Sequence, residues 1–334
     1  MPGPACTVAV DAMGGDRGPG EIVTGAVQAA TELGIGVALV GRAEEITPHL
    51  PVPAPTDVTV IDARDVIAMD DEPVSAVRKL KDSSIVRCAR AVRDGEADAM
   101  VSAGNTGAVT TAAVLRLRRF RGVPSPAIAV PIPVPDHHPQ LLVDAGAMVD
   151  VSPERLVQYA RMATAYAQAR YGLDTPSVAL LSNGEEAGKG DELRKRAHEL
   201  LRDEPGFIGN VEGRDFMHPD RADVIVTDGF TGNVALKSLE GALRSLASVV
   251  FGVLDATPEA REASTVLLPM LLAAAEIYDP DVTGGAVLLG VDGVCIISHG
   301  SSSARAITNA VRVAADCVAT EVVAHMKKAV THAG

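Results

Sequence analysis

The feature that most constrains the fold of this chain is a recurring junction, in which a short apolar run ends in a polar loop with glycine and a helical pattern follows. One example spans 178–190: the run Val178–Leu181 predicts a buried strand, Ser-Asn-Gly is typical of a turn, and a helical pattern begins at Asp191. Three more apolar runs end in the same way, at the loops 102–107, 227–233 and 298–303. Strands that alternate with helices predict an α/β fold, with a mostly parallel sheet between two helical layers.

The predicted elements cover nearly the whole chain. We expect strands at 5–10, 37–40, 58–61, 97–101, 127–134, 141–143, 178–181, 222–226, 284–290 and 294–297. We expect helices at 21–33, 75–93, 152–170, 234–254 and 257–277, after 107 and 191, and from 303 to about 328. Prolines in 127–134 favour a place near a sheet edge. Because the sequence shows no linker, residues 1–334 are expected to form one large α/β unit with a helical sub-domain at about 230–280.

Composition excludes several classes of function. The net charge of −13 and the absence of Trp argue against nucleic acid as a partner. The four cysteines are scattered without a CxxC pair, which favours reduced thiols over disulfides or a metal site. No long apolar segment opens the chain, so we expect no secretory signal. The longest apolar run, 266–275, is interrupted by Pro269 and is far shorter than the roughly 20 residues of a spanning helix.

The four glycine-containing loops predict an anion site. In open α/β sheets the ligand lies beyond the carboxyl ends of the strands, so we expect these loops to meet there. Helix N-termini present free backbone N–H groups to anions, and the loops add hydroxyl and amide groups. This chemistry suits a small anion such as phosphate.

Familiar motifs fit less well. The glycines at 14, 15, 18 and 20 do not match a dinucleotide fingerprint, and 184–190 is one residue short of a P-loop. His299 and Ser301 could act as base and nucleophile, but donation of hydrogen bonds to a bound anion is the favoured interpretation. Of the adjacent Glu185 and Glu186, at most one is expected to act as a general acid or base.

Six segments together resemble the signature blocks of the PlsX family, the phosphate acyltransferases of phospholipid synthesis. They are VDAMGGD (10–16), DEPVSAVRKLKDSS (71–84), SAGNTGA (102–108), NGEEAGKG (183–190), TDGFTGNV (227–234) and HGSS (299–302). The resemblance extends from residue 8 to about residue 312, which is nearly the whole chain. Two positions depart from the family pattern, because Met148 stands where Asn is usual and Ile297 where Lys is often found.

The resemblance implies both a fold and a reaction. The fold would be similar to that of isocitrate and isopropylmalate dehydrogenases, and the protein would be a homodimer. It would transfer a fatty acyl group from acyl-acyl-carrier protein to inorganic phosphate, without cofactor or metal. It would be cytoplasmic and peripherally associated with the membrane, where a glycerol-phosphate acyltransferase would use the acyl phosphate.

The candidate residues follow from this reading. Lys189 and His299 would supply positive charge or a proton, and Asp228 and Glu185 would orient them. Phosphate and the thioester would be bound by Ser102, Gly104, Asn105, Thr106, Gly107, Asn183, Thr231, Gly232, Asn233 and Ser301. The arginines of 116–121 form either a solvated basic face or the landing patch for the acidic carrier protein. The apolar helices at 234–277 form either a dimer interface or a lipid-facing surface, and 246–275 is the expected source of an acyl groove.

Two alternatives stay open. One is a short-chain phosphotransacetylase that uses acyl-CoA. The other is a protein without catalytic activity that binds acyl chains or membranes.

Overall fold

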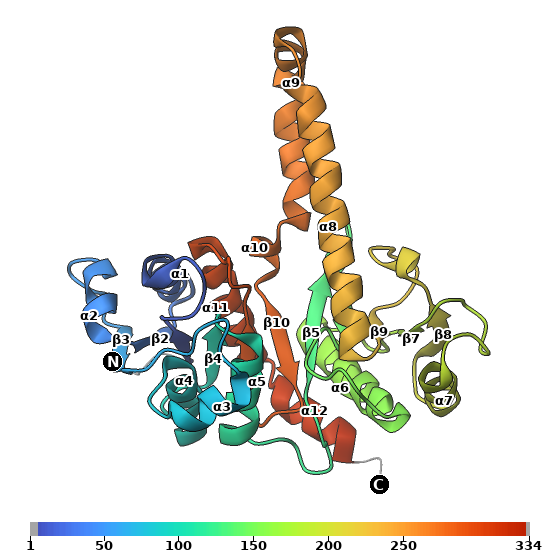
Figure 1. The fold of residues 1–334 in the computed structure, drawn as a ribbon, viewed down its shortest axis with the longest axis horizontal. Helices are drawn as coiled ribbons and strands as arrows, with labels where there is room; N and C mark the ends of the chain where they lie inside the picture. The colour runs from blue at the N-terminus through green and yellow to red at the C-terminus, as the bar shows by residue number, and fades with distance from the viewer. Residues whose placement is uncertain (1–5, 332–334) are drawn as a thin grey trace.

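The computed structural model describes residues 6–331, which are built around one eleven-stranded sheet (Figure 1). From one edge to the other, the strands are β3 (Val58–Asp62), β2 (Gly36–Gly41), β1 (Thr7–Asp11), β4 (Ala99–Ser102), β11 (Val294–Ile297), β10 (Ala286–Leu289), β5 (Ala127–Ile132), β6 (Gln140–Val143), β9 (Val224–Val226), β7 (Val178–Leu181) and β8 (Phe207–Val211). The predicted α/β class and the mostly parallel sheet are confirmed.

The sheet consists of two parallel halves that run in opposite directions. Strands β3, β2, β1, β4 and β11 are mutually parallel, and so are β6, β9, β7 and β8. Between the halves, β10 is antiparallel to β11 and to β5, and β5 is antiparallel to β6. The strands β4 and β11 therefore end at the opposite sheet edge from β7 and β9. The prediction that all four glycine-containing loops lie at one edge is wrong for this reason.

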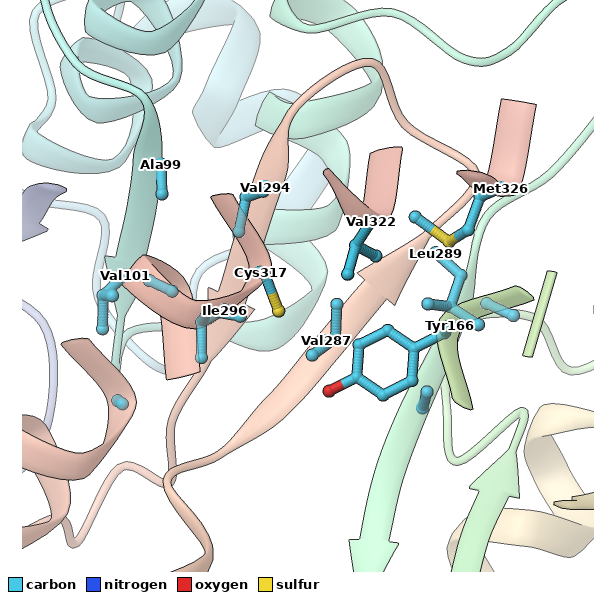
Figure 2. Packing of buried hydrophobic residues seen from close by; sticks show 14 of the residues in the cluster. Ala99, Val101, Tyr166, Val287, Leu289, Val294, Ile296, Cys317, Val322 and Met326 are labelled. Carbon is cyan, nitrogen blue, oxygen red and sulfur yellow. The ribbon is translucent and has the colours of Figure 1, made fainter. Parts of the chain in front are cut away.

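Helices cover both faces of the sheet. One face packs against α1 (Gly18–Leu33), α6 (Pro153–Tyr171), α7 (Glu192–Leu201), α11 (Ala304–Ala319) and α12 (Val322–Thr331). The other face packs against α3 (Pro73–Lys79), α4 (Ser84–Asp94) and α5 (Thr106–Arg116). Figure 2 shows the first face near the sheet centre, where Tyr166 of α6 and Cys317 of α11 pack among valine, leucine and isoleucine side chains of β10 and β11. The three-layer prediction is confirmed.

Three local predictions are wrong. The single helix at 75–93 is divided into α3 and α4, because Ser83 pairs with Asp65 and the chain leaves the helix there. The proline-rich strand β5 lies in the middle of the sheet, but Pro131 sits in the part of β5 that pairs only with β6. The C-terminal helix is divided at Glu321, which has φ 50°.

Short elements complete the chain. They are α2 (Ala43–Ile46), the 3₁₀ turns η1 (Thr47–His49), η2 (Gly213–Asp215) and η3 (Glu276–Tyr278), and α10 (Pro280–Thr283).

Two long helices form a hairpin that rises away from the sheet, α8 (Gly229–Leu254) and α9 (Pro258–Ala275) (Figure 1). Helix α8 begins five residues earlier than the predicted 234, so most of the expected loop at 227–233 is its first turn. The buried residues of the hairpin are Gly229 and Gly232 in α8 and Ser264 in α9. Its exposed large apolar side chains include Leu246, Val249, Val253, Val266, Leu267, Met270 and Leu272. Across residues 6–331, helices fall short of the length and apolar character that a membrane crossing requires.

Candidate active site

Three loops meet at the edge where β1, β4 and β11 end. The Ser298 amide donates to the Ser102 carbonyl at 2.9 Å, and the Asp16 amide donates to the Gly300 carbonyl at 2.7 Å. Gly14 allows the closest approach, because a Cβ there would lie 2.7 Å from the Gly104 nitrogen. These contacts place the predicted loops 102–107 and 298–303 side by side.

A buried carboxyl group fixes this loop cluster. Asp11, the last residue of β1, is 1% exposed and its Oδ2 accepts a 2.6 Å hydrogen bond from the Ser102 hydroxyl. Burial raises the pKa of Asp11, although hydrogen bonds from Ser102 and Ser84 oppose this effect. The Ser102 hydroxyl also accepts from the Gly104 amide at 3.1 Å. The side chain of Ser102 is therefore engaged inside the protein.

Asn105 also makes several internal contacts. Its side-chain oxygen caps α5 by accepting from the Ala108 amide at 3.0 Å. Its amide nitrogen lies within hydrogen-bond distance of the carbonyls of Ala68, Met69 and Asp71. Asn105 thus ties the 68–71 segment to the start of α5. Thr106 beside it is exposed, whereas a Cβ on Gly107 would lie 2.6 Å from Pro73.

His299 and Ser301 form the exposed rim of the same edge. His299 Nδ1 lies 3.1 Å from the Ser301 hydroxyl oxygen, and His299 Nε2 lies 3.2 Å from Nζ of Lys237. Lys237 belongs to the third turn of α8 and is also paired with Glu240 at 2.9 Å. The sequence analysis missed Lys237, because it lies within a long apolar helical pattern and not in a glycine-containing loop.

The second cluster lies where β6, β7 and β9 end, and buried Asp144 organises it. The Asp144 carboxylate accepts from the amides of Ile128 and of 146–148 at 2.8–3.1 Å. Burial raises the pKa of Asp144, and these backbone hydrogen bonds oppose the shift. The first turn of α8 packs directly on this loop, since a Cβ on Gly232 would lie 1.9 Å from the Asp144 carbonyl oxygen. Gly232 is thus a packing requirement.

The N-terminus of α8 is held by an ion pair. Asp228 caps the helix by accepting from the Thr231 amide at 2.9 Å, and it is paired with Arg194 of α7. Arg194 also donates to the Thr231 hydroxyl at 2.8 Å. Burial acts to raise the pKa of Asp228, but the Thr231 hydrogen bonds and Arg194 outweigh it and lower the pKa. Arg194 was not recognised from the sequence, where it reads as one charge on a solvated helix.

The loop 182–190 lies on the outer side of this second cluster. Glu185 is exposed and faces Arg214 at 3.4 Å and Arg221 at 3.6 Å, both from the segment that follows β8. Asn183 and Lys189 are exposed, and the stem of Lys189 packs over Gly184. Lys189 therefore lies on a loop that follows β7, whereas the cation in contact with His299 is Lys237.

Helix α8 joins the two clusters. Asn233 is exposed and packs against Gly146 of the second cluster, where a Cβ on Gly146 would lie 2.8 Å from the Asn233 amide nitrogen. Lys237 lies one turn further along α8, on the same helix face, and reaches His299 of the first cluster. The candidate site is therefore the space between the first three turns of α8 and the loop 298–303. Within residues 6–331, no group of three or more His, Cys, Asp and Glu side chains could hold a metal ion.

The two departures from the PlsX pattern occupy positions that the structure explains. Met148 acts through its backbone, donating to Asp144 at 2.8 Å and accepting from the Gly229 amide at 2.8 Å. Ile297 is the last residue of β11 and is 6% exposed in the core of the sheet.

The eleven-stranded sheet with helices on both faces is a fold that the chain shares with solved phosphotransacylase and dehydrogenase structures. A phosphotransacetylase from Streptococcus pyogenes has a similar fold, with a TM-score of 0.62 and 18% identity over 94% of each chain. A 4-hydroxythreonine-4-phosphate dehydrogenase from Klebsiella pneumoniae also shares the fold, with a TM-score of 0.54 and 14% identity over 94% of this chain and all of the other. The predicted dehydrogenase-like fold is confirmed.

The chain belongs to the fatty acid synthesis protein family, the PlsX family, whose model matches residues 6–325. A relative from Desulfitobacterium hafniense strain Y51 is named phosphate acyltransferase and is 46% identical over 323 residues, 96% of each chain.

Proposed function

We propose that this enzyme transfers a fatty acyl group from acyl-acyl-carrier protein to inorganic phosphate. A phosphate oxygen attacks the thioester carbonyl carbon, so that a C–O bond forms and the C–S bond breaks. With HPO₄²⁻ as the nucleophile, phosphate loses the proton that the leaving thiolate gains, and the products are acyl phosphate and the free carrier thiol. Phosphate needs no activation through a covalent intermediate, so the protein must chiefly position the reactants and stabilise the oxyanion.

The observation that carries this proposal is the closeness of α8 to the rim of the β11 loop. Exposed hydrogen-bonding side chains from both sides, Asn233 on α8 and His299 and Ser301 on the loop, border one space. We assign Asn233, Thr231, Thr106 and Ser301 to phosphate and to the developing oxyanion. In this proposal Asp228 orients Thr231, His299 orients Ser301, and Lys189 with Glu185 shapes the charge of the outer loop.

The internal contacts refine the remaining candidates. The hydroxyl of Ser102 and the amide of Asn105 are engaged in the protein, so they support the loops that carry Thr106 and Ser301. A Cβ atom added at Gly104, Gly107 or Gly232 would lie within 3.0 Å of a neighbouring atom. Their role in the proposal is to permit these close approaches, while Asn183 remains an exposed candidate on the outer loop.

A basic groove is the proposed landing surface for the carrier protein. An open groove of about 620 Å³ lies at the C-terminal end of α5 and is lined by Leu115, Arg118, Arg119 and Phe120. Further arginines lie near the groove: burial lowers the pKa of Arg116, and the charges of Arg90 and Arg93 on α4 lower this pKa further. Helix α5 has 11 residues, so this surface lies about 16 Å from Thr106 at the other end of the helix. Acyl-carrier protein is acidic, and the groove complements it.

The α8–α9 hairpin is the proposed dimer and lipid-facing element. Its exposed apolar side chains, among them Val249, Val253 and Met270, form a surface that a second copy of the chain would cover. Phe230 and Val234 are 62% and 52% exposed in the first turns of α8, which gives an apolar path for the acyl chain from the site toward the hairpin at 246–275. We propose a cytoplasmic homodimer that contacts the membrane peripherally, where a glycerol-phosphate acyltransferase uses the acyl phosphate for phospholipid synthesis.

Trapping of the product with hydroxylamine tests the reaction. Purified protein is mixed with phosphate and long-chain acyl-acyl-carrier protein, and the phosphate-dependent hydroxamate is measured. Long-chain acyl-CoA and acetyl-CoA in parallel reactions rank the donors. Formation of hydroxamate only from acetyl-CoA would favour a short-chain phosphotransacetylase, which the fold of the Streptococcus pyogenes enzyme makes the second candidate.

The absence of product from every donor, with folded protein that sediments with vesicles, would favour a binding protein without catalytic activity.

A further inference from the structure

Lys237 is the cationic side chain that α8 contributes to the candidate site. Its Nζ lies 3.2 Å from His299 Nε2, 2.9 Å from Glu240 Oε2 and 3.1 Å from Glu240 Oε1. The side chain is 50% exposed, so it borders solvent and is not locked inside the protein. Asn233, one turn earlier on α8, lies on the same face and is exposed too.

The contact with Lys237 determines which nitrogen of His299 carries the proton. A lysine ammonium group has three donors and no acceptor, so His299 Nε2 must accept the hydrogen bond and cannot carry a proton. A neutral imidazole has one N–H, and this N–H must then be on Nδ1. Nδ1 lies 3.1 Å from the Ser301 oxygen, so it donates to that hydroxyl.

The hydrogen-bond direction continues to Ser301. Because its oxygen accepts from His299, the Ser301 hydroxyl is free to donate its own proton toward the open side of the loop. The two oxygens of the Glu240 carboxylate, at 3.1 and 2.9 Å, share one N–H of the ammonium group, a second N–H points to His299, and the third N–H remains. Two donors, one of them charged, therefore face the space between α8 and the loop 298–303.

We propose that Lys237 is a catalytic residue: its ammonium group binds phosphate and the developing oxyanion, and it holds His299 in the Nδ1–H tautomer that directs Ser301 toward the same anion. His299 in this arrangement is a positioning residue and not the general base. The inference deepens the proposed function and rests on it for its kinetic readout.

The kinetic test compares Lys237→Met with Lys237→Arg. The control is Lys195→Met, which removes an exposed lysine from α7. Lys237→Met should lower kcat/KM for phosphate roughly 10- to 100-fold, because it removes a charge-assisted hydrogen bond to the anion. KM for the acyl donor should stay within about twofold, Lys237→Arg should recover part of the loss, and Lys195→Met should match the wild type. A near wild-type kcat/KM for phosphate in Lys237→Met would overturn the proposal.

The spectroscopic test does not depend on turnover. Long-range ¹H–¹⁵N spectra of the imidazoles, with the His299 signals assigned through His299→Gln, should show Nδ1–H in the wild type and a change toward Nε2–H in Lys237→Met. Titration with inorganic phosphate should shift the His299 signals at lower phosphate concentration in the wild type than in Lys237→Met. If the wild type makes no acyl phosphate but these shifts occur, the anion site stands and the proposed reaction fails. An Nε2–H tautomer in the wild type would refute the role of Lys237.

Discussion

Substitution of Gly232 by alanine should damage both the stability and the activity of the enzyme. A Cβ at this position would lie 1.9 Å from the Asp144 carbonyl oxygen and 3.0 Å from its carbon. The obstacle is backbone and not a flexible side chain, so the start of α8 must move by about 1 Å to restore normal contact. Overpacking of this kind costs about 1–3 kcal/mol of folding free energy.

The same movement displaces the site. Thr231 and Asn233 flank Gly232 on α8, and the helix must carry both of them away from the Asp144 loop. A displacement of about 1 Å at reacting groups can lower the rate roughly 100-fold. We therefore expect Gly232→Ala to lower the Tm by about 1–4 °C and kcat/KM roughly 100-fold.

A matched glycine on the same helix provides the control. A Cβ at Gly241 would meet nothing within 4 Å, and alanine is a better helix former than glycine by about 1 kcal/mol. Gly241→Ala should therefore raise the Tm slightly and leave the hydroxamate assay unchanged. The measurements are thermal unfolding by circular dichroism and the phosphate-dependent hydroxamate rate. If Gly232→Ala unfolded at the same temperature as Gly241→Ala, the close packing of α8 on the Asp144 loop would be refuted.

Three further predictions address the Asp228–Arg194 ion pair, the contact of Asn105 with the 68–71 segment, and the α8–α9 hairpin. Asp228→Asn keeps a good helix cap but removes the charge paired with Arg194, and should cost about 1–3 kcal/mol in denaturant unfolding at pH 7. Because the pKa of Asp228 is lowered in the folded protein, its contribution to the free energy of unfolding is complete above the unfolded value near 3.8 and is lost as the pH falls through the folded pKa. The wild type should therefore lose more stability than Asp228→Asn below pH 4, and an equal loss in the two proteins would contradict this. Asn105→Asp keeps the α5 cap but loses the donors to the 68–71 carbonyls, and should increase proteolysis within that segment. An unchanged cleavage pattern would show that these hydrogen bonds do not hold the segment in place. Val249→Asp, at a side chain 64% exposed in one copy, should convert a dimer into a monomer in analytical ultracentrifugation, and a persistent dimer would remove this face of the hairpin from the interface.

The sequence was sufficient for the alternation of strands and helices, because apolar periodicity is a local property. Sheet direction is not local. The reversal between the two halves depends on β10 and β5, whose antiparallel pairing joins residues far apart in the chain, such as Val287 and Ala129. A proline in a strand normally indicates an edge, but Pro131 is tolerated in the centre because β10 pairs with the other part of β5.

The site was predicted in part for a similar reason. Loops with glycine, hydroxyl and amide groups could be recognised one at a time, and His299 and Ser301 do border the candidate site. Their partner Lys237 comes from a helix that starts at the opposite edge of the sheet, so no sequence spacing connects it to them. Lys189 was chosen as the cation because it lies in a loop that follows a strand. The strands before this loop and before the loop of His299 run in opposite directions, and the role of Lys189 stays a prediction.

The segment at 227–234 shows why a motif cannot be read as a row of ligands. Its residues have different roles. Glycine is required at 229 and 232 because atoms of the 144–148 loop occupy the space that a side chain would need. The Asp228 carboxylate caps α8 and forms an ion pair with Arg194. Asn233 remains exposed with Lys237 one turn beyond it. The packing residues bring α8 down on the sheet at one fixed depth, and that depth determines where along the helix a lysine can reach His299. A shift of α8 by one residue along its axis, about 1.5 Å with a rotation of 100°, would turn Lys237 away from the loop, so the glycines act on the chemistry through the position of the helix.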